Sequence, residues 1–160
     1  MKLTTRRGML SIIYVLLVLF QIKTTNVKTA YSFTPAEIDW QIQRMNMFPP
    51  ALARLGYIME VKREVQILEK LQNNFFTVVD FKEYFPNRLP YILSPFVLTG
   101  LYFFVSERHK WRLVYYSLFS SIIILTIIGP NAKYGPVLMF PYFAFFVFLS
   151  VSKIIRKAKR

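Results

Sequence analysis

Four long uncharged stretches dominate the pattern of the chain, one near its start and three in its second half. They cover residues 9–22, 89–105, 113–128 and 137–151, and the charged residues are confined to the segments between them. Apolar stretches of about 15 residues or more can cross a hydrocarbon core of about 30 Å as helices, with some local thinning of the bilayer. None alternates polar and apolar residues as a barrel strand would. The pattern predicts an all-α integral membrane protein with about four transmembrane helices.

The first stretch has two interpretations. It follows a basic N-terminus containing Lys2, Arg6 and Arg7, and it is short for a spanning helix but near the upper limit for a signal-peptide core. A cleavage site after Ala30 would place Lys28 where a small residue is required, well beyond the apolar core. We therefore favour an uncleaved signal-anchor over a cleaved signal peptide, which would leave three spans.

The charges between the stretches predict the orientation. The chain has 21 Lys+Arg and 8 Asp+Glu, a net charge of +13, and a mean hydropathy of +0.36. Basic residues gather before the first stretch, in segment 106–112 and in the tail from Lys153 onward, whereas segment 129–136 holds Lys133 as its only charge. Because cytoplasmic loops are enriched in Lys and Arg, both termini are expected in the cytoplasm of a multi-pass protein of the cell membrane. No basic segment is interleaved with aromatics as in nucleic-acid binders, so no nucleic acid is expected as a partner.

These features divide the chain into four parts. Residues 1–22 form the cytoplasmic N-terminus and signal-anchor helix, and residues 23–88 a small helical extracytoplasmic insertion. Residues 89–155 form a three-helix transmembrane bundle, and residues 156–160 a basic cytoplasmic tail.

The insertion begins with a helix that has clear boundaries. Thr34-Pro35-Ala36-Glu37 is a capping-box pattern with proline at the first helical position. The helix is expected to reach Met47 and to stop before Pro49-Pro50, because residues that precede proline avoid the α region.

A second helix is predicted over 51–72, with Asn73-Asn74 ending it. It carries an apolar seam with the spacing of heptad a and d positions, which is expected to pack on the first helix and the membrane surface. A coiled-coil partner from another chain, bound through residues 55–75, is the alternative. The aromatic segment 75–86 is expected to lie at the headgroup level and lead into residue 89, with a platform for lipid or sugar as the other possibility. The seam consists of Leu55, Ile58, Val61, Val65, Leu68, Leu71 and Phe75.

Groups capable of catalysis are scarce. The chain has no cysteine, and its one histidine, His109, has no second histidine to share a metal with. Two pairs of carboxylates, Glu37 with Asp39 and Asp80 with Glu83, could bind a divalent metal or act as a general base, but we interpret them as ordinary surface charge. We therefore predict no catalytic, cofactor-binding or metal-binding residue and no cofactor.

The apolar stretches carry no ionisable Asp, Glu, Lys, Arg or His. Such residues normally mark ion paths and proton relays, so a transporter or pump is disfavoured. A small channel would need polar faces aligned on three spans, which the pattern does not show. Ser117, Ser120, Ser121 and Gly100 are small residues that let helices approach closely.

Three segments, IDWQIQRMNMFPPALARL, LQNNFFTVVDFKEYFP and LPYILSPFVLTGLYFF, follow one another over about Ile38 to Phe104. Their order resembles the extracytoplasmic and C-terminal membrane segment of multi-spanning dolichyl-phosphate-mannose-type glycosyltransferases. Those enzymes carry their acidic catalytic residues on the first extracytoplasmic loop of a much longer bundle, so no residue carries over to this chain. The resemblance implies a relative without the catalytic part, associated with envelope glycan assembly.

The expected function is that of a non-enzymatic scaffold or accessory subunit in cell-envelope assembly. Its expected partners are the lipid bilayer and another membrane protein. The alternative is a fragment or relative of a membrane glycosyltransferase that uses a lipid-linked sugar.

Overall fold

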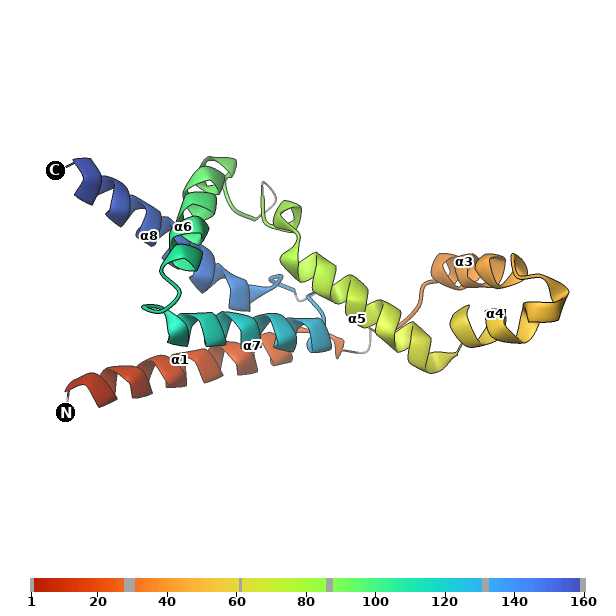
Figure 1. The fold of residues 1–160 in the computed structure, drawn as a ribbon. Helices are drawn as coiled ribbons and strands as arrows, with labels where there is room; N and C mark the ends of the chain where they lie inside the picture. Colours follow the sequence, from red (N-terminus) through yellow and green to blue (C-terminus); the bar gives the residue numbers. More distant parts are fainter. Residues whose placement is uncertain (1, 28–30, 61, 86–87, 131–132, 159–160) are drawn as a thin grey trace.

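The structure is a computed structural model that describes residues 2–27, 31–60, 62–85, 88–130 and 133–158 (Figure 1). Within these residues the secondary-structure elements are seven α-helices and four short 3₁₀-helices. The predicted all-α class is therefore confirmed.

Four helices occupy the four apolar stretches and form the bundle. They are α1 (Lys2–Thr24), α6 (Ser94–Ser106), α7 (Arg112–Ile128) and α8 (Phe140–Ala158). The short helices η3 (Tyr91–Leu93) and η4 (Val137–Met139) lead into α6 and α8. Figure 1 shows α1 and α7 side by side, with both chain ends and the α6–α7 turn at one end of the bundle.

One described helical segment is long and apolar enough to cross a membrane, judged by length and composition. It is Val137–Lys157, whose mean hydropathy reaches 1.9. The segments Ser11–Thr24, Tyr91–Ser106 and Arg112–Ile128 are apolar helices of 10–17 residues. One described helical segment thus meets these criteria, where the sequence pattern predicts about four spans.

The tightest packing in the bundle is between α6 and α8. Gly100 is buried where the main chains of the two helices meet, against Phe146. Aromatic rings from both helices fill the space around this crossing: Phe104 lies 5.4 Å from Phe146, centroid to centroid, and Phe143 is buried beside Tyr84. The crossing therefore fixes α6 against α8.

A buried glutamine fastens α1 to the turn before α8. The Gln21 side chain is fully buried, donates to the Gly135 carbonyl at 3.3 Å and accepts from the Val137 amide at 2.9 Å. It also donates to the Thr25 hydroxyl at 3.3 Å. A buried amide is stable only with its hydrogen bonds made, so this residue fixes the end of α1 against residues 135–137.

The insertion contains α3 (Pro35–Asn46), η1 (Pro50–Leu52), α4 (Ala53–Glu60) and α5 (Arg63–Val79). Figure 1 shows α3 and α4 as a hairpin that projects away from the bundle, connected to it through α5. We call residues 35–60 the arm. The predicted capping box is confirmed: the Thr34 hydroxyl accepts from the Glu37 amide at 3.3 Å, and the Glu37 carboxylate accepts from the Thr34 amide at 2.7 Å.

The prediction of one helix over 51–72 is wrong in two respects. The chain forms η1, α4 and α5 instead, with a break between Glu60 and Arg63. Helix α5 also continues through Asn73-Asn74 to Val79. Asn74 is buried and donates its side-chain amide to the Thr126 carbonyl of α7 at 3.2 Å. This contact with the bundle stabilises the helix where local propensity favours its end.

The break divides the predicted seam. Leu68 is 63% exposed and Leu55 is 45% exposed, so the first helix does not cover these two seam residues, while their contact with a membrane surface stays a prediction. Val61 lies outside the described residues. With α4 and α5 as separate helices, the a and d positions of one no longer continue on the other.

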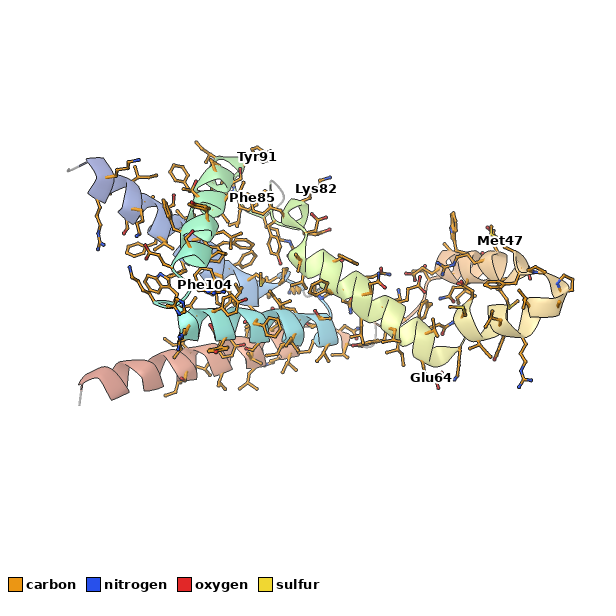
Figure 2. All side chains as sticks on the ribbon, viewed as in Figure 1. Met47, Glu64, Lys82, Phe85, Tyr91 and Phe104 are labelled. Atoms are coloured by element: carbon orange, nitrogen blue, oxygen red, sulfur yellow. The ribbon has the colours of Figure 1, made fainter. Side chains whose placement is uncertain are left out.

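The aromatic segment 75–86 begins as the last part of α5 and ends in the bundle, while its position at the headgroup level stays a prediction. Helix η2 (Phe81–Glu83) leads to Tyr84 and Phe85, both buried, with Phe85 pointing toward the bundle in Figure 2. The Tyr84 hydroxyl donates to the Val78 carbonyl at 2.8 Å, and burial raises the pKa of Tyr84 far above its ordinary value of 10.0. Tyr84 and Phe85 therefore belong to the core, whereas Phe75 and Phe76 of the same segment are 42% and 58% exposed.

Candidate functional site

A cluster of hydroxyl groups lies where α1, α7 and α8 meet. The Tyr14 hydroxyl contacts the hydroxyls of Ser120 and Ser121, the second at 3.2 Å. The Ser121 side chain is fully buried, and its hydroxyl lies 3.0 Å from that of Tyr142. The serines thus do more than allow close packing, because they provide hydrogen-bond partners for two tyrosine hydroxyls inside the bundle.

An open groove of about 460 Å³ borders this cluster. No carboxylate, amine or imidazole lines it, so it offers hydroxyl groups and apolar surface but no group for acid–base chemistry at neutral pH. Its shape and lining suit an apolar chain. The side chains that line it include Tyr14, Leu17, Leu113, Ser117, Leu138 and Tyr142.

The carboxylates Asp80 and Glu83 meet in an open groove of about 510 Å³ at the end of α5. Asn73, Phe76 and Thr77 also line this groove. One oxygen of Asp80 accepts from the Lys82 amide at 2.9 Å and so caps η2. Within the described part of the chain, neither carboxylate forms an ion pair. The structure therefore brings the two predicted carboxylates together, and one of them, Asp80, is engaged as the cap of η2.

The other pair is divided. Glu37 accepts from Lys70 Nζ at 2.6 Å, whereas Asp39 is exposed and lies outside the network. The hydrogen bond from Lys70, followed by that from the Thr34 amide, holds the pKa of Glu37 below its ordinary value of 4.5. Glu37 therefore stays ionised at neutral pH and is a poor general base.

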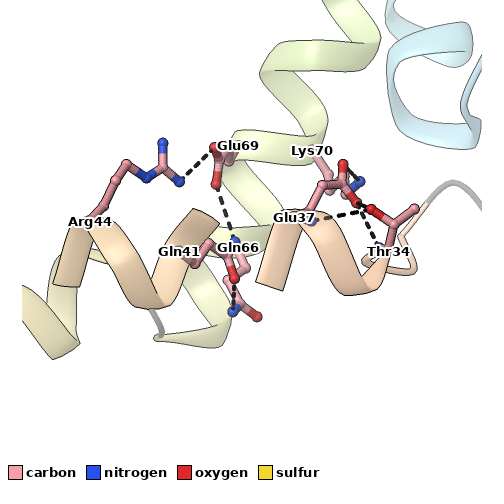
Figure 3. A network of polar contacts seen from close by, with 7 residues as sticks. All are labelled: Thr34, Glu37, Gln41, Arg44, Gln66, Glu69 and Lys70. Atoms are coloured by element: carbon pink, nitrogen blue, oxygen red, sulfur yellow. Dashed lines mark hydrogen bonds and ion pairs between the residues drawn. The ribbon is translucent and has the colours of Figure 1, made fainter. Parts of the chain in front are cut away.

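The network around Glu37 fastens α3 to α5 (Figure 3). Gln66 donates to Gln41 at 3.0 Å, and Arg44 pairs with Glu69 at 3.2 Å. Gln41 is buried. The network therefore holds α3 of the arm against α5 and has a structural role.

The turn between α6 and α7 gathers basic groups. Glu107 is paired with Lys153 of α8 and with Lys110 at 3.3 Å. The hydrogen bond from Lys153, followed by that from Lys110, holds the pKa of Glu107 below its ordinary value. His109 is exposed, and its Nδ1 lies 3.2 Å from Arg112 Nη2.

The described residues contain no group of three or more His, Cys, Asp or Glu side chains arranged to hold a metal ion. No family of known proteins, no curated protein and no solved structure matches the chain. The function must therefore be argued from the geometry of the molecule itself.

Proposed function

We propose that this chain is a non-enzymatic multi-pass membrane protein that serves as a scaffold or accessory subunit in cell-envelope assembly. The exterior of the bundle supports a membrane location. In the most apolar part of α8, 39% of residues are buried, whereas the core helix of a soluble protein is mostly buried. Large apolar side chains are exposed on all four bundle helices: Ile12, Leu16, Leu19, Leu98, Val105, Phe119, Ile127 and Phe148.

Four spans with both termini in the cytoplasm fit the arrangement of these helices. Figure 1 places both chain ends and the α6–α7 turn at one end of the bundle, and the arm at the other. The basic N-terminus, segment 106–112 and tail then share one side of the membrane, in agreement with the positive-inside rule. The three shorter helices would cross with local thinning of the bilayer.

The observation that carries the scaffold proposal is the apolar surface of the arm. Figure 2 shows Met47 on the arm, away from the bundle. Exposed apolar side chains on a segment that projects from a membrane bundle support a role for that segment in binding a partner protein. The exposed apolar residues of the arm do not belong to the core of the chain. We therefore propose that a partner protein in the envelope binds them. The exposed apolar residues are Ile38, Trp40, Ile42, Met47, Leu52, Leu55, Tyr57, Ile58 and Met59.

Site-specific photo-crosslinking in intact cells tests this proposal. A photoreactive residue in place of Tyr57, which is 55% exposed, should form an adduct with one protein. Leu55→Asp should abolish that adduct, because a carboxylate would have to be desolvated at the interface. The matched control is Gln43→Asp, which places the same charge at an exposed polar position of α3.

The outcome also separates protein from lipid as the arm's partner. Adducts with lipid alone would mean that the arm lies on the membrane surface and would contradict the scaffold function. A protein adduct that survives Leu55→Asp would place the contact elsewhere on the arm.

A relative of membrane glycosyltransferases that uses a lipid-linked sugar is the second candidate. It is favoured by the groove in which Asp80, Glu83 and the exposed ring of Phe76 lie together. Carboxylates beside an aromatic ring are a common arrangement for binding sugars, and resemblance of residues 38–104 to such enzymes supports the same proposal. We rank it second because one of the two carboxylates serves as a helix cap.

A further inference from the structure

The α6–α7 turn contains a groove whose lining is basic and aromatic. Arg108, His109 and Arg112 line it together with Tyr115 and Tyr116 from the first turns of α7. Its volume is about 410 Å³, and no carboxylate borders it. Two guanidinium groups, which are always charged in proteins, therefore face one open space.

The positive charge of this groove is not neutralised from within the chain. Glu107 is the only acidic residue after residue 83. Its carboxylate is engaged by Lys153 and Lys110. Among the described residues, Arg108 and Arg112 take part in no ion pair. An anion from outside the chain would complete the charge balance.

The contact between Arg112 and His109 adds a donor to the groove. A guanidinium group can only donate, so His109 Nδ1 accepts at 3.2 Å and the neutral ring carries its proton on Nε2. The hydroxyls of Tyr115 and Tyr116, whose side chains are 49% and 70% exposed, supply further donors. The groove thus presents donors of three kinds and fits a group with several acceptor oxygens.

We infer that this groove binds the phosphate of an anionic phospholipid from the surrounding membrane. The inference rests on the proposed membrane location, which sets the turn at the cytoplasmic surface. Planar guanidinium groups match phosphate oxygens two at a time, and tyrosines at this depth lie among headgroups. Exposed apolar side chains of α7, including Leu113 and Phe119, continue from the groove and provide a surface for the acyl chains. A phospholipid can contact both the donors of the groove and the apolar surface beside it, whereas a soluble phosphate can contact only the donors.

Tryptophan fluorescence in vesicles tests the inference. The chain has two tryptophans, so Trp40→Phe leaves Trp111, next to Arg112, as the only one. The protein is reconstituted in phosphatidylcholine vesicles that contain brominated phosphatidylglycerol or, in a parallel sample, brominated phosphatidylcholine. We expect phosphatidylglycerol to be preferred beside Trp111 by at least about fivefold, the preference that one basic residue near an anionic surface provides.

The variant Arg108→Gln with Arg112→Gln should abolish this preference, with helix content by circular dichroism unchanged. The matched control, Arg156→Gln with Lys157→Gln, removes two charges from the tail and should retain it. Equal loss in both variants, or equal quenching by the two lipids from the start, would overturn the site but leave the membrane location intact. Absence of quenching by either lipid would overturn both. A preference that disappears on addition of inorganic phosphate at constant ionic strength would overturn the lipid assignment in favour of a soluble anion.

Discussion

Gly100 of α6 lies directly against the main chain of Phe146 in α8. A β-carbon placed on Gly100 would lie 1.9 Å from the Phe146 carbonyl oxygen and 2.8 Å from its α-carbon. These atoms belong to the backbone of a neighbouring helix, so they cannot move aside as a flexible side chain would. Only glycine allows α6 and α8 to cross at this distance.

Gly100→Ala should therefore separate α6 from α8. We expect a loss of about 1–3 kcal/mol in stability, the usual cost of an overpacked core, and a larger loss for Gly100→Leu. Thermal unfolding of the purified protein in detergent measures the effect. Leu98→Ala, at a position that is 53% exposed on the same helix, is the control and should change little. A melting temperature for Gly100→Ala equal to that of the control would show that the two helices do not cross here.

The positions of helices follow from local signals in this chain, but their mutual packing does not. Thr34, Pro35 and Glu37 define the start of α3 within four residues, so the sequence predicts that cap correctly. Asn74 shows why the end of α5 could not be predicted in the same way. Its local preference is to end a helix, but a hydrogen bond to Thr126, 52 residues away, keeps it inside one.

The candidate sites also differ in how far the local sequence predicts them. The carboxylates Asp80 and Glu83 are three residues apart, so their shared groove could be expected from the sequence. The cluster of Tyr14, Ser121 and Tyr142 joins three helices, and nothing in the local sequence links these residues. Gln21 likewise gives no local signal of its role in joining α1 to the turn before α8, because Gly135 and Val137 lie more than 100 residues further along the chain.

Gln21→Leu tests that role. Leucine fills a similar volume but leaves the Val137 amide and the Gly135 carbonyl without their side-chain partner, which costs about 1–3 kcal/mol for buried groups. We expect lower thermal stability and faster hydrogen exchange at the Val137 amide. Gln43→Leu makes the same substitution at an exposed position of α3 and should leave both measurements unchanged. Slow exchange at Val137 in the Gln21 variant would mean that another group replaces the glutamine.

The pKa of Glu37 should show whether the ion pair between Glu37 of α3 and Lys70 of α5 forms. Lys70 lowers this pKa in the folded protein, so Lys70→Gln should return it toward 4.5 in an NMR titration. Lys62→Gln is the control, since Lys62 lies 4.0 Å from Glu64 and does not contact Glu37. A Glu37 pKa that is the same in both variants would mean that the pair does not form.

The lowered pKa also gives the sign of the pH dependence. A carboxylate whose folded pKa is depressed adds stability above its unfolded pKa, and this stability is lost as the pH falls through the folded value. The arm should therefore loosen below about pH 4.5. The Glu37 side chain is 41% exposed, so the pair contributes only about 0.2–1 kcal/mol. Glu37→Gln should remove this part of the acid sensitivity.

The proposed topology predicts the location of reporter fusions. Fusions after Ser106 and after Arg160 should report the cytoplasm, because the proposed topology puts the basic segments on that side. Fusions within residues 37–82 or at Asn131 should report the opposite side of the membrane. A cytoplasmic signal from within residues 37–82 would contradict the four-span arrangement.

The final prediction is that this chain alone has no catalytic activity. Acid–base or nucleophilic catalysis needs at least two reactive groups held in a shielded pocket. Asp80 and Glu83 share a groove, but the groove is open and Asp80 caps η2 through the Lys82 amide. Asparagine retains an oxygen that can accept this hydrogen bond and is an equally good cap.

Asp80→Asn with Glu83→Gln should therefore leave the fold and any phenotype of the gene unchanged in a complementation assay. Gly100→Leu, which disrupts the α6–α8 crossing, should abolish complementation, because the proposed scaffold function depends on packed helices. The amount of each variant in the membrane is measured in parallel, so that loss of function can be separated from loss of protein. If the double carboxylate variant accumulates normally but fails to complement, the groove at the end of α5 has a chemical role. That result would favour the glycosyltransferase alternative over the scaffold.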